Sequence, residues 1–222
     1  MFKRNFLAAA TMTIAVTMMM ASSAHATILA PGNTVTPTVL SNLSTLIGGA
    51  PTILADTGII GYSNASETGT YEARVYKDVT AGYLDFVYDV NETASVNSPL
   101  VSMSMGIWTG WGSDVYYVSS SPLTGTNVTT SAANDTATRT AAGNSVRFVF
   151  NANGVDGSIV AQSAEMVIRV QAPTFVAGTY TLQDNVTENL KGFQPANTPE
   201  PASMAMIGAG LLALGLYRRR IS

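Results

Sequence analysis

Hydrophobic and polar side chains alternate along much of the chain after residue 70. The alternation is clearest in residues 71–78 and 83–90, which a turn-like Val-Thr-Ala-Gly segment separates. Because successive side chains of a strand point to opposite faces, the two segments predict an antiparallel hairpin. We expect one face to be buried, with Tyr71, Ala73, Val75, Leu84, Phe86, Tyr88 and Val90. We expect the other face to lie in water, with Glu72, Arg74, Asp78, Asp85 and Asp89.

The same period of two recurs farther along the chain. Residues 101–108, 145–150 and 165–170 show it, with shorter candidates at 114–118 and 178–182. The expected buried side chains are Val101, Met103, Met105, Ile107, Val146, Phe148, Phe150, Met166, Ile168 and Val170. Short strands separated by Gly, Asn, Pro and Ser clusters favour an all-β fold. We therefore predict an antiparallel β-sandwich of the jelly-roll or immunoglobulin-like kind rather than a barrel.

Two segments do not follow this pattern. Residues 38–48 have apolar side chains at helical spacing, but their Thr and Ser content also suits an irregular strand. Residues 119–144 are rich in Ser, Thr, Ala and Asn, which indicates long exposed loops or weak edge strands.

The N-terminal end has the three parts of a secretory signal peptide. Two basic residues precede an apolar stretch over residues 6–20, and small cleavage-type residues follow. We predict that residues 1–26 form a signal helix that is removed. An uncleaved membrane anchor is the weaker alternative, because the apolar stretch is short. The cleavage-site residues are Ala24, Ala26 and Thr27, with Thr27 as the new N-terminus.

Composition narrows the chemistry of the rest of the chain. Of the 14 acidic residues only Glu200 lies outside residues 27–197, and of the 11 basic residues five lie outside, which leaves 13 acidic and six basic side chains. A segment that is net negative by seven charges repels nucleic acid. The chain has no cysteine, so packing must stabilise the fold, and its one histidine, His25, lies in the predicted leader.

Without histidine or cysteine after the predicted leader, a Ser-His-Asp triad, a thiol nucleophile and a histidine-bearing zinc site are excluded. We therefore expect no catalytic residue, no cofactor and no metal, in a protein that is not an enzyme. A carboxylate-dependent hydrolase is an alternative, because carboxylates distant in sequence could converge. Asp85 and Asp89 do not suit this chemistry, since four residues of strand separate them by roughly 13 Å.

Two short motifs offer weaker binding chemistry. Trp108 and Trp111 are three residues apart, and exposed rings there would stack on sugars, so both are candidate glycan contacts of a carbohydrate-binding module. Buried rings are the commoner arrangement. Residues 151–157 offer oxygen ligands for calcium, although the Asn-Gly and Asp-Gly pairs in them also indicate hairpin turns.

The C-terminal residues 198–222 combine Pro-Glu-Pro, an apolar stretch and an arginine cluster. At a rise of about 1.5 Å per residue, the uncharged residues 202–217 would form a transmembrane helix roughly 24 Å long, shorter than the ~30 Å hydrocarbon core. Such a helix suits temporary retention in the inner membrane, with the arginines held in the cytoplasm. The residues of this signal are Pro199, Glu200, Pro201, Arg218, Arg219 and Arg220.

This order of elements resembles the PEP-CTERM sorting signal of Gram-negative bacteria that make exopolysaccharide. An ordinary tail anchor is the alternative. The resemblance implies that a membrane enzyme of the exosortase type recognises and processes the tail. We therefore expect an exported protein that is anchored before processing and then lies at the cell surface or in the extracellular matrix. Its β-sandwich domain, residues 27–197, would have a non-enzymatic structural or interaction role, with exopolysaccharide as a candidate partner.

Overall fold

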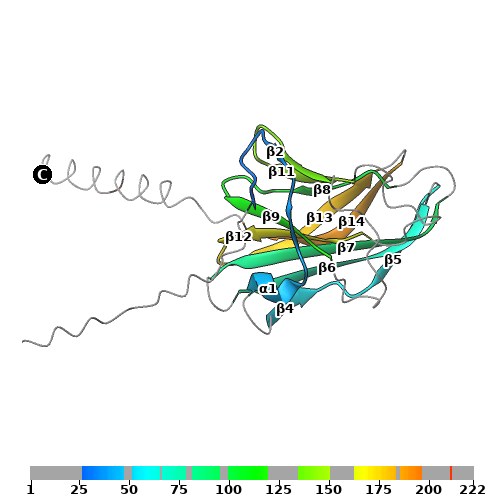
Figure 1. Cartoon of the computed structure of the whole chain (residues 1–222), viewed down its shortest axis with the longest axis horizontal. Coiled ribbons are helices and arrows are strands. Elements are labelled where there is room, and N and C mark those ends of the chain that lie inside the picture. The colour runs from blue at the N-terminus through cyan, green and yellow to red at the C-terminus, as the bar shows by residue number, and fades with distance from the viewer. Residues whose placement is uncertain are drawn as a thin grey trace, which may run out of the picture.

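The structure of the chain is a computed structural model that describes residues 27–47, 52–65, 67–78, 82–95, 100–119, 135–150, 163–183 and 186–196, together with Leu211. In these residues the strands form two sheets, and one short helix lies beside them (Figure 1). The described strand pairs are antiparallel, apart from the parallel pair of β3 with β9. The prediction of an all-β, mainly antiparallel fold is confirmed.

The larger sheet has eight strands in the described part of the chain. Its main order is β1-β9-β12-β7-β6-β4, while β3 pairs with β9 and β5 pairs with β6. The strand bounds are β1 Thr27–Ile28, β3 Thr38–Leu40, β4 Thr52–Asp56, β5 Ile60–Ser63, β6 Glu67–Lys77, β7 Leu84–Ser95, β9 Ser113–Val118 and β12 Glu165–Val170. The predicted hairpin is the pair of β6 and β7, in which Val75 is opposite Phe86.

The smaller sheet has six strands among the described residues, in the order β14-β13-β8-β11-β10-β2. The bounds are β2 Thr34–Val35, β8 Ser102–Gly106, β10 Thr136–Arg139, β11 Ser145–Val149, β13 Phe175–Gln183 and β14 Thr187–Pro195. In Figure 1 this sheet faces one side of the larger sheet.

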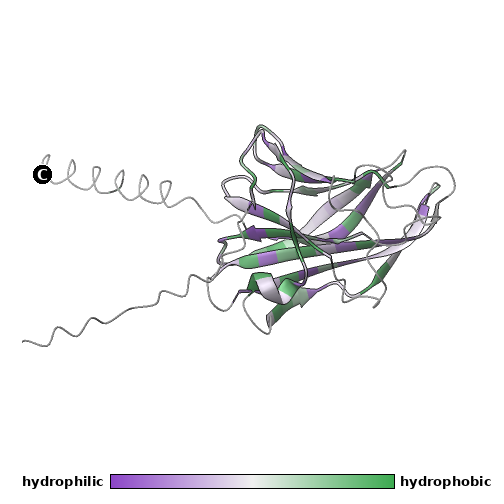
Figure 2. Cartoon of the chain, in the orientation of Figure 1, coloured by the Kyte–Doolittle hydropathy of each residue, from purple (hydrophilic) through white to green (hydrophobic). Residues whose placement is uncertain are grey.

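The main hydrophobic core takes side chains from both sheets. Tyr180 of β13 packs edge-on against Tyr71 and Tyr88 of the larger sheet, with 5.5 and 5.3 Å between ring centroids. Green and purple residues mix along the strands in Figure 2, as the alternating sequence pattern requires. The predicted core positions that are confirmed are Tyr71, Ala73, Val75, Leu84, Phe86, Tyr88, Val90, Met103, Met105, Val146, Phe148, Phe150, Met166, Ile168 and Val170.

Two predicted core positions at the ends of β8 are wrong. Val101 is 37% exposed and Ile107 is 44% exposed. Ile107 has a φ of 65°, a left-handed conformation that β-branched residues rarely adopt. The alternation of faces therefore stops at Gly106, where β8 ends.

We call the face of the larger sheet that points away from the smaller sheet the outer face. The prediction that this face lies in water is wrong over its middle. Asp85 and Asp89 have 0% exposed surface, and Glu72, Arg74 and Asp78 are also buried. A period of two separates the faces correctly, but it cannot show that a further layer covers the polar one.

Part of that layer is the helix α1 (Leu43–Ile47), which lies against the outer face in Figure 1. Its Leu46 and Ile47 are buried in a second core with side chains of the larger sheet, namely Tyr76, Val87, Tyr116, Val118 and Val167. The helix begins after Asn42, whose Oδ1 accepts a hydrogen bond from the Thr45 amide at 2.8 Å. This is the usual N-cap arrangement, because the side chain satisfies an amide that has no partner in the first turn.

The two segments left open by the pattern have mixed outcomes. Residues 38–47 contain both expected forms, since β3 is followed closely by α1. Within residues 119–144 the structure describes β10, which lies next to the short strand β2 at one edge of the smaller sheet. Residues 120–134 are outside the described part.

Several predictions concern residues outside the described part of the chain. They are the signal helix of residues 1–26 with Ala24 and Ala26, the calcium-type loop of residues 151–157, and the sorting residues Pro199, Glu200, Pro201, Arg218, Arg219 and Arg220. Of the predicted transmembrane helix, residues 202–217, the structure describes Leu211, which is helical and 66% exposed. Among the residues described, no helix has the length and apolar character needed to cross a membrane.

Candidate functional site

The two tryptophans flank a tight turn that places them in different environments. The Trp111 amide donates to the Trp108 carbonyl at 3.2 Å, and Gly110 has a φ of 83°. A positive φ at the third position of such a turn favours glycine. Trp108 has no exposed surface, and its ring packs edge-on against Phe86 with 5.2 Å between centroids. A buried ring has no face free for a sugar, so Trp108 is removed from the candidate glycan contacts.

Trp111 is half-buried and lines a hollow of about 490 Å³ at one end of the larger sheet. The antiparallel pairing brings the start of β7, the end of β12 and the start of β9 to this end. The turn between the tryptophans and the first strand complete the wall. The lining residues are Ile28, Tyr83, Gly110, Trp111, Gly112, Ser113, Asp114 and Gln171.

Arg169 of β12 anchors two walls of this hollow. Its guanidinium carbon lies 5.4 Å from the centre of the Tyr83 ring, within the range of a cation–π contact. Its neighbours across the sheet are Asp114 on β9 and Asp85 on β7. The Arg169 Nε donates to Asp85 at 2.8 Å, and Nη2 donates to Asp78 at 2.8 Å. These bonds fix the Arg169 side chain, and through it the position of the Tyr83 ring, before any ligand arrives.

The charges around Arg169 are mainly negative. Asp78, Asp85 and Asp114 surround this one guanidinium, since the first two are ion-paired with it and the third is its neighbour on β9. Burial raises the pKa of Asp114, and Arg169 opposes that rise. Burial also raises the pKa of Asp85, against the hydrogen bond from Arg169. The surroundings of the hollow therefore disfavour a ligand that brings further negative charge.

Arg139 ties together backbone segments that border the lining residues of the hollow. This buried side chain donates from Nη2 to the Trp108 carbonyl at 2.6 Å, from Nη1 to the Leu29 carbonyl at 3.2 Å and from Nε to the Gly143 carbonyl at 3.1 Å. Leu29 follows Ile28 of the hollow, and Trp108 begins the turn that leads to Trp111. Arg139 thus ties the N-terminal strand to the tryptophan turn.

The lining residues offer contacts of several kinds. Trp111 and Tyr83 supply flat aromatic surface, Asp114 accepts hydrogen bonds, and Gln171 both donates and accepts them. A Cβ atom placed on Gly110 or Gly112 would meet nothing within 4 Å, so the backbone is open there. Within the described ranges, no group of three or more Asp, Glu, His or Cys residues is arranged to hold a metal ion. The hollow is suited to binding through stacking and hydrogen bonds.

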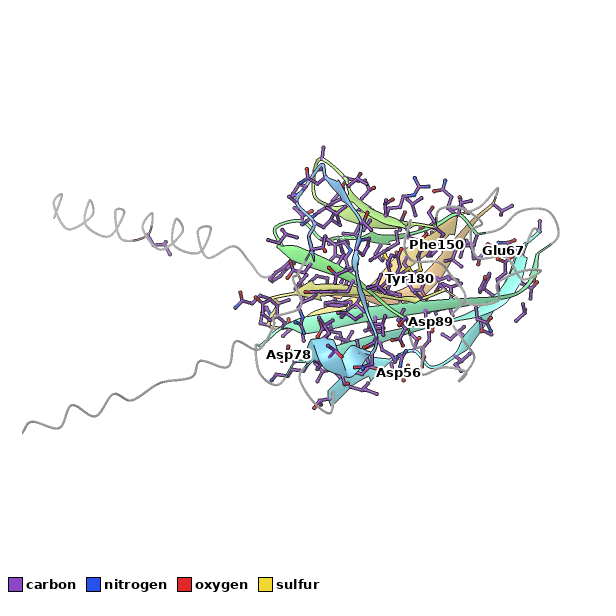
Figure 3. All side chains as sticks on the ribbon, viewed as in Figure 1. Asp56, Glu67, Asp78, Asp89, Phe150 and Tyr180 are labelled. Carbon is purple, nitrogen blue, oxygen red and sulfur yellow. The ribbon has the colours of Figure 1, made fainter. Side chains whose placement is uncertain are left out.

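A second group of polar residues, which we call the Arg74 cluster, lies on the outer face. Arg74 donates to Glu165 at 2.7 Å, lies 3.4 Å from Glu72 and donates to the Tyr76 hydroxyl at 2.9 Å. Asp89 is opposite Glu72 in the register of β6 and β7. Figure 3 labels Asp89 on this side of the sheet and Tyr180 on the other. Burial raises the pKa of Glu165 to about 7, although Arg74 opposes the rise.

The sequence identified Trp111 but not the other polar and aromatic residues of the hollow. Tyr83 precedes β7, Asp114 lies in β9 and Gln171 follows β12. Only the register of these three strands brings them together. The sequence contains one indication of their shared position. Tyr83, Asp114 and Gln171 each lie at, or next to, an end of a predicted strand. Which strand ends meet depends on strand order, which a single sequence does not contain.

Comparison with known proteins gives one match, at the C-terminal end of the chain. The family model of the PEP-CTERM protein-sorting motif matches residues 197–220. The tail is a PEP-CTERM sorting motif. This confirms the resemblance predicted from Pro-Glu-Pro, the apolar stretch and the arginines. No curated protein and no solved structure matches the chain.

The PEP-CTERM motif implies a protein that is exported, processed by exosortase at the membrane and sorted to the surface. The matched residues follow β14, the last described strand, in the sequence, and they include no lining residue of the hollow. The sorting motif and the hollow are therefore separate features of the chain, one concerned with its destination and the other available for binding.

Proposed function

We propose that the chain is an exported protein that an exosortase-type enzyme cuts at its PEP-CTERM tail, and that then acts at the cell surface or in the extracellular matrix. The match at residues 197–220 carries this proposal. The predicted signal peptide supports it, because a leader sends the domain outward while Arg218, Arg219 and Arg220 keep the tail end in the cytoplasm. Until it is cut, the tail serves as a temporary anchor in the inner membrane.

The sorting step is tested in a host that contains an exosortase. The full chain is compared with a truncation after Thr198 and with Glu200→Gln, which removes the charge of the motif while keeping its shape. Glu188→Gln on β14 is the matched control. Cell fractionation and mass spectrometry of the C-terminus report location and processing. We expect the full chain and the control to lose the tail, the truncation to skip membrane retention, and Glu200→Gln to accumulate uncut in the membrane. Unchanged location and processing in both tail variants would refute the proposal.

For the domain itself we propose a non-enzymatic structural or interaction role. The buried carboxylates Asp85 and Glu165 are ion-paired with Arg169 and Arg74, an arrangement that suits a stable scaffold. The hollow beside Trp111 is preorganised by Arg169 and Arg139, as a binding surface requires. The domain would therefore present a rigid surface to other components outside the cell.

A carboxylate-dependent hydrolase is the competing function. It needs two carboxylates that face each other across a pocket, whereas the lining of the hollow has one, Asp114. A reducing-end assay on soluble polysaccharides separates the two. We expect no release of sugar ends by the exported protein. Release that is lost in Asp114→Asn would overturn the non-enzymatic role.

A further inference from the structure

We propose that the hollow lined by Trp111, Tyr83, Asp114 and Gln171 is a binding site for a neutral glycan. The inference rests on the proposed function in one respect, because export is what brings the domain to polysaccharide outside the cell. It deepens that function by naming a ligand class and the residues that take it. Tyr83, Asp114 and Gln171 are separate from the tryptophan motif that first suggested sugar binding.

Two aromatic residues of the hollow suit the apolar face of a sugar. A sugar ring has apolar faces made of C–H groups and a polar rim of hydroxyls. Trp111 and Tyr83 line the same hollow and offer aromatic surface to such a face. Trp111 is half-buried and packs against the main core, while Arg169 contacts the Tyr83 ring, so both rings are held in place. Little conformational entropy is then lost on binding.

The polar residues match the rim of a sugar. The Asp114 carboxylate accepts hydrogen bonds from hydroxyl groups, and the Gln171 amide can donate to one hydroxyl and accept from another. Gly110 and Gly112 leave their backbone open to close approach, because no atom lies within 4 Å of a Cβ at either position. Stacking surface surrounded by a few fixed polar groups is typical of small-ligand sites.

The size and position of the hollow suit part of a chain rather than a buried small molecule. Its volume of about 490 Å³ is within the range of ligand sites, roughly 300–1,000 Å³. Ile28, Gly110, Gly112 and Gln171 are exposed, so a long chain can reach the hollow from outside. An extended polymer can therefore place one or a few units against Trp111 and continue into solvent.

The charges select a neutral glycan over an acidic one. Asp78, Asp85 and Asp114 surround Arg169, which is already bound by the first two. Residues 27–197 carry 13 acidic and six basic side chains, so the whole domain also repels anions. A polymer of uronic acids would be repelled both by the carboxylates around Arg169 and by the net negative charge of the domain. A neutral polymer would be repelled by neither.

Affinity electrophoresis in native gels tests the proposal. The full chain is expressed with export and purified in a detergent without a sugar headgroup, since such headgroups would compete. The gels contain soluble starch, β-glucan, galactomannan or xylan, with polygalacturonate as the acidic comparison. We expect retardation by at least one neutral polymer and none by polygalacturonate. No retardation by any neutral polymer, or retardation by polygalacturonate alone, would overturn the proposal.

Two pairs of variants locate the site. Trp111→Ala removes the stacking surface and should weaken binding at least about tenfold, as loss of a central aromatic does. Val176→Ala, on the smaller sheet, is its control. Gly112→Leu fills open space at the hollow, and Gly106→Leu does the same on β8, outside the lining. We expect Gly112→Leu to abolish retardation and both controls to keep it. Retardation in Trp111→Ala and Gly112→Leu equal to that of the parent would place binding elsewhere and overturn the assignment.

Fluorescence gives an independent readout. The chain has two tryptophans, so Trp108→Phe leaves Trp111 as the single reporter. The polymer that retards the parent should shift the emission of this variant, and an unchanged spectrum would contradict contact at Trp111. Location is followed in the same cultures. A chain that is sorted normally but binds no glycan refutes this inference alone, while a chain that binds glycan but is not processed refutes the proposed sorting alone.

Discussion

The Nη2 atom of Arg74 lies 2.7 Å from Oε1 of Glu165, and the two side chains are 7% and 0% exposed. The pair joins β6 to β12 across β7, which lies between them in the larger sheet. Glu72 lies 3.4 Å from the same guanidinium. Asp89, which is opposite Glu72 in the sheet, adds a further buried carboxylate close to Glu72 and Glu165. The buried Arg74 is therefore ion-paired with two carboxylates of the outer face, and a third carboxylate lies close to them.

Removing this arginine should cost much of the stability of the domain. Arg74→Met keeps a similar length but removes the positive charge that is paired with Glu72 and Glu165. We expect the free energy of unfolding at neutral pH to fall by about 3–5 kcal/mol, because breaking a buried pair leaves a buried charge uncompensated. Arg147→Met, at an exposed position of β11, is the matched control and should change it by less than about 0.5 kcal/mol. Urea unfolding measures both, and equal effects would contradict a special role for Arg74.

The same cluster should make stability depend on pH. Burial raises the pKa of Glu165 from 4.5 to about 7, against the effect of Arg74 and with the help of Asp89 and Glu72. A carboxyl group with a raised pKa binds its proton more tightly in the folded state. Its favourable contribution is complete below its unfolded pKa and is lost as the pH rises through the folded value. Between about pH 5 and pH 8 this loss is of the order of 2–3 kcal/mol.

Glu165→Gln isolates that effect, because glutamine imitates the protonated acid and can still accept from Arg74. Between acidic and slightly alkaline buffer, the parent should lose more stability than Glu165→Gln by that amount. Glu188→Gln, on β14 and outside the Arg74 cluster, should follow the parent. Unfolding curves at a series of pH values provide the comparison. Parallel curves for the parent and Glu165→Gln would show that Glu165 does not titrate in this window.

Much of the fold follows from the period of two. Phe86 and Tyr88 alternate with Asp85 and Asp89, and the sequence assigned the aromatic face to the core correctly. It placed Asp85 and Asp89 in water because a polar face is usually the solvated one. The structure buries both of them. Asp85 is paired with Arg169, which also donates to the Leu46 carbonyl of α1, so its burial depends on contacts between segments far apart in the chain. Local pattern determines which side chains share a face, whereas tertiary contacts determine what covers it.

The candidate site likewise depends partly on local sequence and partly on tertiary contacts. Ile107 adopts a left-handed φ, so Trp108 enters the core and Trp111 lies at the hollow, although both stood in one motif. A β-branched residue gives no sign of such a conformation in the sequence. Asp114 and Gln171 meet Trp111 only through strand order. The sorting motif, by contrast, was identified from its residues alone, because its elements are contiguous in the sequence.

A glycine in β6 offers a sharp test of packing in the larger sheet. Gly69 lies at a bulge, where the register of β6 with β7 shifts after Thr68. A Cβ atom at Gly69 would collide with the Asn91 carbonyl and come within 2.7 Å of the Tyr62 hydroxyl. The carbonyl belongs to the backbone of β7 and cannot move without disturbing the sheet. Gly69→Ala should therefore destabilise the domain by about 1–3 kcal/mol, the usual cost of overpacking.

Gly106→Ala on β8 is the control for this change, because a Cβ there meets nothing within 4 Å. Alanine also restricts the unfolded chain more than glycine does, so this variant should be neutral or more stable by up to about 1 kcal/mol. Thermal unfolding of the two variants beside the parent measures the contrast. If Gly69→Ala unfolds at the same temperature as Gly106→Ala, then β5, β6 and β7 do not pack as closely at the bulge as the structure shows.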